Sequence, residues 1–204
     1  MPTQAYHDAV AEGARHHQSS KTYSGRFLRH QKPFLVELAR EHDCHSGLDV
    51  GSGKGAQFSW IDPIDGHTIE QALGFEIVKH DPCWPPYAAE PVGSFDLVIC
   101  THTISLIPLS DLDWFTERLC NFSNKVVFVA EKIGPRKKGE IADPENRAIG
   151  WDRGQWQEWF AQYADAYPGL TIILSTLERL ERGKITTRHI WSGGNYEEYE
   201  VGAQ

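Results

Sequence analysis

The chain of 204 residues carries a formal net charge of -8, and its hydrophobic and charged fractions of 40% and 24% are those of an ordinary globular protein. This length suits one substantial core, so we expect a single domain over residues 1–204. The negative charge disfavours binding to extended duplex nucleic acid. The sequence shows neither a bilayer-spanning apolar run nor the order of a signal peptide, so we expect a cytoplasmic protein with no membrane partner.

The cysteines and histidines show no metal-binding or redox pattern. The cysteines are far apart and form no C-x-x-C pair, so we expect reduced, mostly buried thiols. They are Cys44, Cys83, Cys100 and Cys120. Many histidines lie near the N-terminus without a recognisable ligand spacing, and we expect no metal site.

Apolar periodicity predicts helices first and then an alternation of strands and helices. Residues 6–17 and 26–42 have helical spacing, so residues 1–45 form a helical lid or flank and residues 46–204 an α/β core. Strand-like runs are "GLDV", "LGFEIV", "FDLVICT", "KVVFVAE", "LTIILST" and "KITTRHIW", with helical runs "DLDWFTERLC" and "QWQEWFAQYA" between some of them. This alternation indicates a mostly parallel sheet. The connection "LERLERG" is too short for a crossover helix, so we expect an antiparallel pair at the sheet edge.

The stretch "SGLDVGSGKG" places Gly51, Gly53 and Gly55 directly after the first strand. Glycines at a turn from strand to helix tolerate positive φ and let a ligand approach the backbone. The spacing excludes a P-loop, whereas Gly51-x-Gly53-x-x-Ala56 fits a dinucleotide fingerprint, so NAD is one candidate ligand. Asp49, two residues before Gly51, favours instead a ligand with an ammonium group.

These residues resemble class I S-adenosylmethionine-dependent methyltransferases, and in particular a group of small methyltransferase-domain proteins of bacteriophages. The resemblance rests on "LDVGSGKGAQF", "HDPCWPPYAAEPVGSFDLVICT", "PRKK" followed by Asn146, and "QWQEWF". It implies a Rossmann-like class I methyltransferase sandwich, S-adenosylmethionine as cofactor, and a small-molecule or nucleotide-like acceptor.

The resemblance also implies roles for residues of the glycine turn and of the strand ends. Gly51, Gly53 and Gly55, with Ser52 between them, would lie against the methionine part of the cofactor, and Asp49 would help to hold its amino group.

A carboxylate at the end of the second strand would receive the ribose hydroxyls. Asp81 is our choice and Glu76 is the rival. Thr101, at the end of the "FDLVICT" strand, completes the expected cofactor contacts. The segment from Asp81 to Phe95 is too short for a full helix and strand, so one βα unit is missing or reduced.

The sequence departs from the family where many relatives carry an acid and a histidine. His102 replaces an Asp, Ser105 a Glu and Leu106 a His, and Ala148 replaces a histidine expected after Asn146. His102 is the titratable residue left in this place, either as the base that takes a proton from the acceptor or as a packing residue.

Two further features are candidates for acceptor binding. Arg136, Lys137 and Lys138 form a basic loop that either recruits a phosphate-bearing acceptor or is only solvated. Trp151 precedes an aromatic helix face and is free to line a pocket. The function is then methyl transfer; a cofactor-binding partner or regulator that has lost catalysis is a second hypothesis, and an NAD-dependent oxidoreductase a third.

Overall fold

The computed structural model of the chain describes residues 1–18, 23–24, 26–133, 149–180 and 183–201. These residues form one seven-stranded sheet with the strand order β2-β1-β3-β4-β5-β6-β7. The strands are β1 (Gly47–Val50), β2 (Ile77–His80), β3 (Phe95–Thr101), β4 (Ser123–Ile133), β5 (Thr171–Leu180), β6 (Gly183–Ser192) and β7 (Asn195–Val201). The α-helices are α1 (Gln4–His17), α2 (Lys32–Glu41), α3 (Ile69–Leu73), α4 (Leu112–Phe122) and α5 (Arg153–Ala166). Short 3-10 turns lie at η1 (Phe27–Gln31), η2 (Pro85–Tyr87), η3 (Ile104–Leu106) and η4 (Leu109–Asp111).

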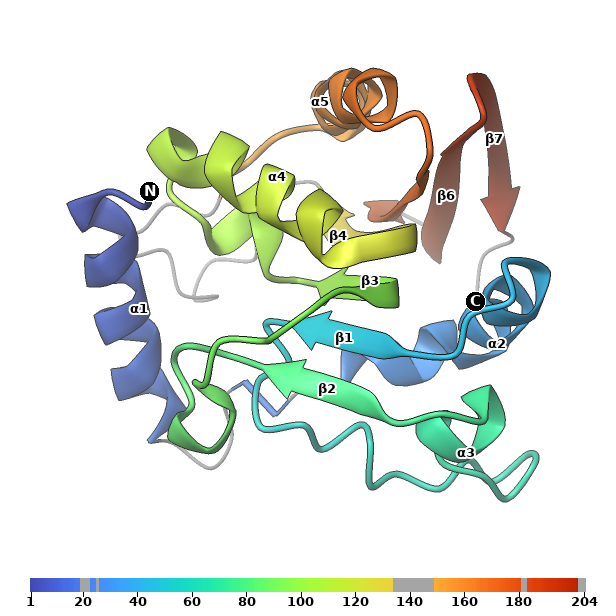
Figure 1. Cartoon of the computed structure of the whole chain (residues 1–204), viewed down its shortest axis with the longest axis horizontal. Coiled ribbons are helices and arrows are strands. Elements are labelled where there is room, and N and C mark those ends of the chain that lie inside the picture. The colour runs from blue at the N-terminus through green and yellow to red at the C-terminus, as the bar shows by residue number, and fades with distance from the viewer. Residues whose placement is uncertain (19–22, 25, 134–148, 181–182, 202–204) are drawn as a thin grey trace.

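The first five strands are parallel and follow the order 2-1-3-4-5 of doubly wound sheets. In such sheets ligands bind outside the carboxyl ends of the strands where the order reverses, which here is between β1 and β3. The arrowheads of β1 and β2 point toward α1, which lies beyond these carboxyl ends (Figure 1). The topology therefore predicts a ligand crevice between α1 and the sheet.

Each face of the sheet buries its own apolar cluster, because successive strand residues point to opposite faces. Leu48 and Val98 lie with apolar residues of α4 and α5 on one face. Leu97 and Phe128 lie with apolar residues of α2 and α3 on the other. The predicted α/β class is thus confirmed, with helices on both faces of a mostly parallel sheet.

The C-terminal part of the sheet confirms the expected antiparallel pair and adds a strand. β5 and β6 pair antiparallel, and β7 pairs antiparallel with β6 and forms the edge. All β7 residues but the last are exposed, and its sequence "NYEEYEV" gave no apolar face by which to predict it.

Two segments near the glycine turn differ from the sequence prediction. Within the described stretch 26–133 no helix starts at the glycine turn; turns and loop lead instead to α3, which begins at Ile69. Strand β2 begins at Ile77, later than the apolar run "LGFEIV" indicated, because Gly74 with φ +82 caps the end of α3. Between β2 and β3 the 3-10 turn η2 is the whole of the described secondary structure, as expected for a reduced βα unit.

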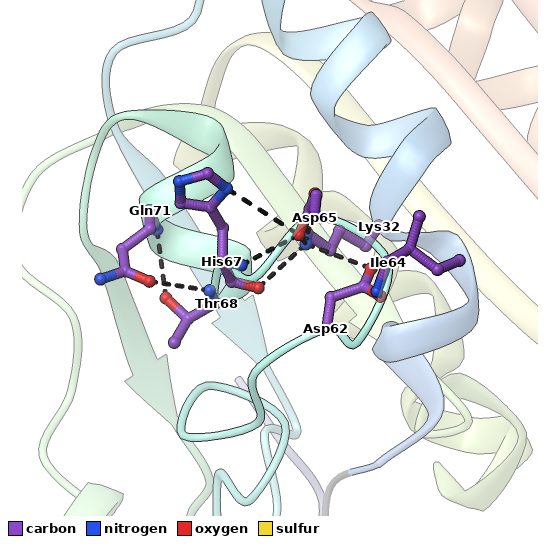
Figure 2. Close-up of polar contacts among 7 residues, drawn as sticks. All are labelled: Lys32, Asp62, Ile64, Asp65, His67, Thr68 and Gln71. Atoms are coloured by element: carbon purple, nitrogen blue, oxygen red, sulfur yellow. Dashed lines mark hydrogen bonds and ion pairs between the residues drawn. The ribbon is translucent and has the colours of Figure 1, made fainter.

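A buried lysine fixes the long loop between the glycine turn and α3 (Figure 2). Lys32 at the start of α2 is 2% exposed, and its Nζ donates to Asp62 Oδ2 at 3.2 Å, to Asp65 Oδ1 at 2.6 Å and to the carbonyl oxygen of His67 at 2.9 Å. A buried ammonium needs such partners because its desolvation is costly. This ion cluster holds a loop that has little regular structure of its own.

Candidate functional site

The candidate site is a pocket of about 520 Å³ between α1 and the carboxyl ends of β1, β2 and β3. This volume lies in the range of pockets that hold cofactors and drug-sized ligands. The glycine turn and the ends of the strands form one side of the pocket, and α1, η3 and α4 form the other. The apolar residues include Tyr6, Val10, Leu106, Ile107 and Phe115.

The glycine turn forms one wall of the pocket and requires glycine for two reasons. Gly51, Gly53 and Gly55 all have positive φ, between +59° and +78°. A Cβ added to Gly51 would lie 2.1 Å from Oγ1 of Thr103, so the turn packs directly on the loop after β3. The Gly51 N–H donates to the carbonyl oxygen of His80 at 2.7 Å, which ties the turn to the end of β2.

Asp81 lies directly after β2 and faces the glycine turn. Its Oδ2 accepts from the Gly53 N–H at 2.8 Å, and its Oδ1 accepts from the Cys83 N–H at 2.9 Å. Asp81 lines the pocket, whereas Glu76 is exposed and precedes β2 at the opposite end of the strand. The structure therefore separates the two candidates for a carboxylate in the crevice and leaves Asp81.

Asp49 lies behind the wall of the pocket. Its side chain is fully buried, and among the described residues Gln57, not Asp49, lines the pocket. The Gln57 Nε2 donates to Asp49 Oδ2 at 2.8 Å, while Asp49 Oδ1, Gln57 Oε1 and Ser52 Oγ are buried without a hydrogen-bond partner. Burial, with a smaller contribution from Asp81, raises the pKa of Asp49 to about 7 although the hydrogen bond from Gln57 lowers it.

Thr101 and His102 stand at the carboxyl end of β3, and both line the pocket. His102 has a φ of +53°, a conformation uncommon for a residue with a Cβ and typical of functional sites. The imidazole lies nearly perpendicular to the ring of Phe27, with a centroid distance of 3.7 Å, and its Nδ1 lies 3.6 Å from Glu131 Oε1.

Glu131, near the end of β4, is 2% exposed and accepts from two backbone N–H groups. They belong to Ser105, at 3.3 Å, and Lys132, at 2.9 Å. These bonds hold the carboxylate beside the imidazole of His102.

Helix α1 covers the pocket through contacts at both of its ends. At its N-terminus, the backbone N–H and the hydroxyl of Thr3 both donate to the carboxylate of Asp111, each at 2.6 Å. At its C-terminus, His17 Nε2 lies 3.7 Å from Asp81 Oδ2. Burial lowers the pKa of His17, although Asp81 opposes this, so burial favours the neutral imidazole.

The structure describes one of the residues predicted for acceptor binding, Trp151. Arg136, Lys137 and Lys138 fall outside the described residues, as does Ala148. Trp151 packs against Trp156 and Trp159, with ring centroids 4.9 and 5.3 Å apart, and is not among the described residues that line the pocket.

Several residues of the site had not been predicted. Gln57 stands two residues after the last glycine of the turn, so its place in the sequence was a usable signal. His17 and Glu131 gave no local signal, because only the folded chain brings their elements to the site. Across the described parts of the chain there is no group of three or more His, Cys, Asp or Glu side chains that could hold a metal ion.

Comparison of the chain with protein-family models, with curated proteins and with solved structures gave no match. Among the described segments, no helix combines the length and the apolar character needed to cross a membrane.

Proposed function

We propose that the chain is an S-adenosylmethionine-dependent methyltransferase that acts on a small or nucleotide-like acceptor. The observation that carries the proposal is the meeting of the glycine turn and Asp81 in one pocket at the switch point of the sheet, with Gly53 N–H bound to Asp81 Oδ2 at 2.8 Å. The turn brings bare backbone to the ligand, and the carboxylate supplies acceptors for a diol.

The residues present fit this cofactor. The Asp81 carboxylate lines the pocket and is oriented by the N–H groups of Gly53 and Cys83. Because a carboxylate oxygen can accept more than one hydrogen bond, it is suited to receive ribose hydroxyls. Gln57 lines the pocket, and its buried Oε1 has no hydrogen-bond partner, so it calls for a donor group at the glycine turn, which suits an ammonium. Thr103 packs directly against Gly51, so a side chain at this position of the turn would not fit.

The same geometry argues against a dinucleotide. In dinucleotide sites the pyrophosphate lies at the N-terminus of a helix that follows the glycines directly. Within the described residues 26–133 no helix starts there, and the N–H of Gly53 already binds a carboxylate, which would repel a phosphate. The glycines therefore match the dinucleotide fingerprint in their spacing alone, without the helix that follows them in dinucleotide sites.

The chemistry that the bound cofactor supplies is an electrophilic methyl group on a sulfonium. In our proposal the chain positions the acceptor and excludes water, and α1 serves this second role by covering the pocket. The imidazole of His102 takes the proton that an attacking hydroxyl or amine loses, and Glu131 orients it through Nδ1.

One observation favours the second hypothesis, a cofactor-binding partner or regulator that has lost catalysis. Leu106 lines the pocket where relatives carry a histidine, and it cannot exchange a proton. The two hypotheses separate by turnover: an enzyme releases S-adenosylhomocysteine when a suitable acceptor is present, and this release falls in His102→Gln while cofactor binding stays. A regulator binds the cofactor and turns over none.

Isothermal titration calorimetry tests the proposal directly. We expect S-adenosylmethionine and S-adenosylhomocysteine to bind with micromolar affinity and NADH not to bind. Asp81→Asn should weaken both sulfur ligands. The matched control is Asp96→Asn, because Asp96 lies at the opposite end of β3, where it accepts from the N–H of His45. Binding of NADH, or of none of the three, would overturn the proposal.

A further inference from the structure

Three buried polar atoms without partners gather at the glycine turn. They are Asp49 Oδ1, Ser52 Oγ and Gln57 Oε1, and the side chains that carry them are at most 1% exposed. Each unsatisfied buried acceptor costs about 1–3 kcal/mol, so a cluster of them is rare unless a ligand completes it. The group that completes this cluster must donate hydrogen bonds, and a cation does so best because both carboxylate and amide oxygens favour it.

Only part of this cluster can be reached from the pocket. Gln57 lines the pocket, whereas Asp49 lies behind it on the face of β1 that packs toward α2. The hydrogen bond from Gln57 Nε2 to Asp49 Oδ2, 2.8 Å long, fixes the orientation of the amide. With its nitrogen held by the carboxylate, the amide leaves Oε1 as the polar atom for a ligand.

We propose that Gln57 is the residue that recognises the ammonium group of the ligand, and that Asp49 is a positioning residue that acts through it. The proposal rests on the proposed function, and it replaces the direct contact between Asp49 and the amino group that the sequence predicts. It makes Gln57 the residue by which the site distinguishes ligands with an amino group from ligands that carry only the adenosine part.

The protonation of Asp49 couples to this recognition. The pKa of Asp49 is raised to about 7: burial is the main cause, the hydrogen bond from Gln57 opposes it, Asp81 adds to the rise and Lys79 opposes it. An ionised Asp49 accepts from Nε2 and leaves Oε1 to the ligand. A protonated Asp49 instead donates to Oε1, which turns Nε2 toward the pocket and repels an ammonium. Affinity for a ligand with an ammonium group therefore rises with pH near neutrality.

The test compares three probes by calorimetry at pH 8. S-adenosylhomocysteine carries both ammonium and carboxylate, decarboxylated S-adenosylmethionine carries the ammonium alone, and 5′-methylthioadenosine carries neither. Gln57→Leu should weaken the first two about 10- to 100-fold, the loss of one hydrogen bond to a charged group, and leave the third unchanged. Gln162→Leu, the same change at an exposed position of α5, is the matched control.

Each outcome separates the two proposals. Equal weakening of all three probes, or no weakening of any, overturns the role of Gln57 while the cofactor proposal stands. Failure of the wild type to bind any probe overturns the cofactor proposal and the role of Gln57 together. If Gln57→Leu does not fold, Gln57→Glu is the decisive variant, because it keeps an acceptor oxygen. It should bind the two ligands that carry an ammonium group at least as tightly as wild type. Selective loss of binding of these two ligands would contradict the role of Gln57.

Discussion

Ionisation of Asp49 should make the protein less stable as the pH rises, the reverse of the usual behaviour of carboxylates. Burial raises the pKa of Asp49 from 3.8 to about 7, so between these values the folded chain holds a proton that the unfolded chain has released. The stability that the proton of Asp49 contributes is fully present below the pKa of the unfolded chain and is lost as the pH rises through the pKa of the folded chain. The difference between the folded and unfolded pKa values corresponds to about 4 kcal/mol of unfolding free energy, since one pKa unit is about 1.4 kcal/mol.

The assay is urea unfolding of the wild type and of Asp49→Asn at several pH values. An asparagine keeps the acceptor for Gln57 but does not titrate, so the difference between the two proteins isolates the carboxyl group. Relative to the variant, the wild type should lose about 3 kcal/mol of unfolding free energy between pH 5 and pH 8. Asp96→Asn controls for the loss of a less buried carboxylate.

A constant difference in unfolding free energy between wild type and Asp49→Asn across this range would contradict this prediction, because it would mean that Asp49 ionises as easily in the folded chain as in the unfolded one. Saturating S-adenosylhomocysteine provides a second readout. Its ammonium should stabilise the ionised carboxylate and flatten the pH dependence of the wild type.

Two further substitutions test the structure of the site and its support. Gly51→Ala should destabilise the chain by about 2–4 kcal/mol, because the alanine would be strained at positive φ and its Cβ would clash with Thr103. The control is Gly66→Ala, which has a similar φ but open space around it and should show only the cost of the backbone strain. Equal effects of the two variants in chemical denaturation would contradict the tight packing of the turn. Lys32→Met leaves two carboxylates without the buried ammonium between them and should cost about 3 kcal/mol of unfolding free energy. The control Lys125→Met removes a more exposed ammonium from its ion pairs with Asp43 and Asp96 and should cost under about 1 kcal/mol. Equal shifts of the two variants in thermal melts would show that the burial of Lys32 adds nothing.

The sequence was most informative where apolar patterning is strong. The run "FDLVICT" predicted β3 almost to the residue, because a strand buried on both faces needs a continuous apolar sequence. The edge strand β7 could not be predicted in the same way, since its side chains are nearly all exposed. The extent of β2 was misjudged because the apolar run before it belongs partly to the end of α3.

The sequence predicts those residues of the candidate site that directly follow the ends of strands. Asp81 and the glycine turn meet because neighbouring parallel strands end at the same edge of a sheet. The place of Gln57 just after the glycines indicates that it lies near the turn. Its hydrogen bond to Asp49 is not indicated by the sequence, because this bond depends on how the loop after the glycines folds back. The positive φ of His102 likewise has no signature in the sequence.

A crystal structure of the protein grown with S-adenosylhomocysteine would test the proposed cofactor site most directly. We predict that the ligand lies in the pocket under α1, with its ribose hydroxyls on Asp81 and its ammonium against Oε1 of Gln57. A pocket that stays empty at saturating ligand, or a ligand bound with its adenosine away from Asp81, would contradict the proposed site.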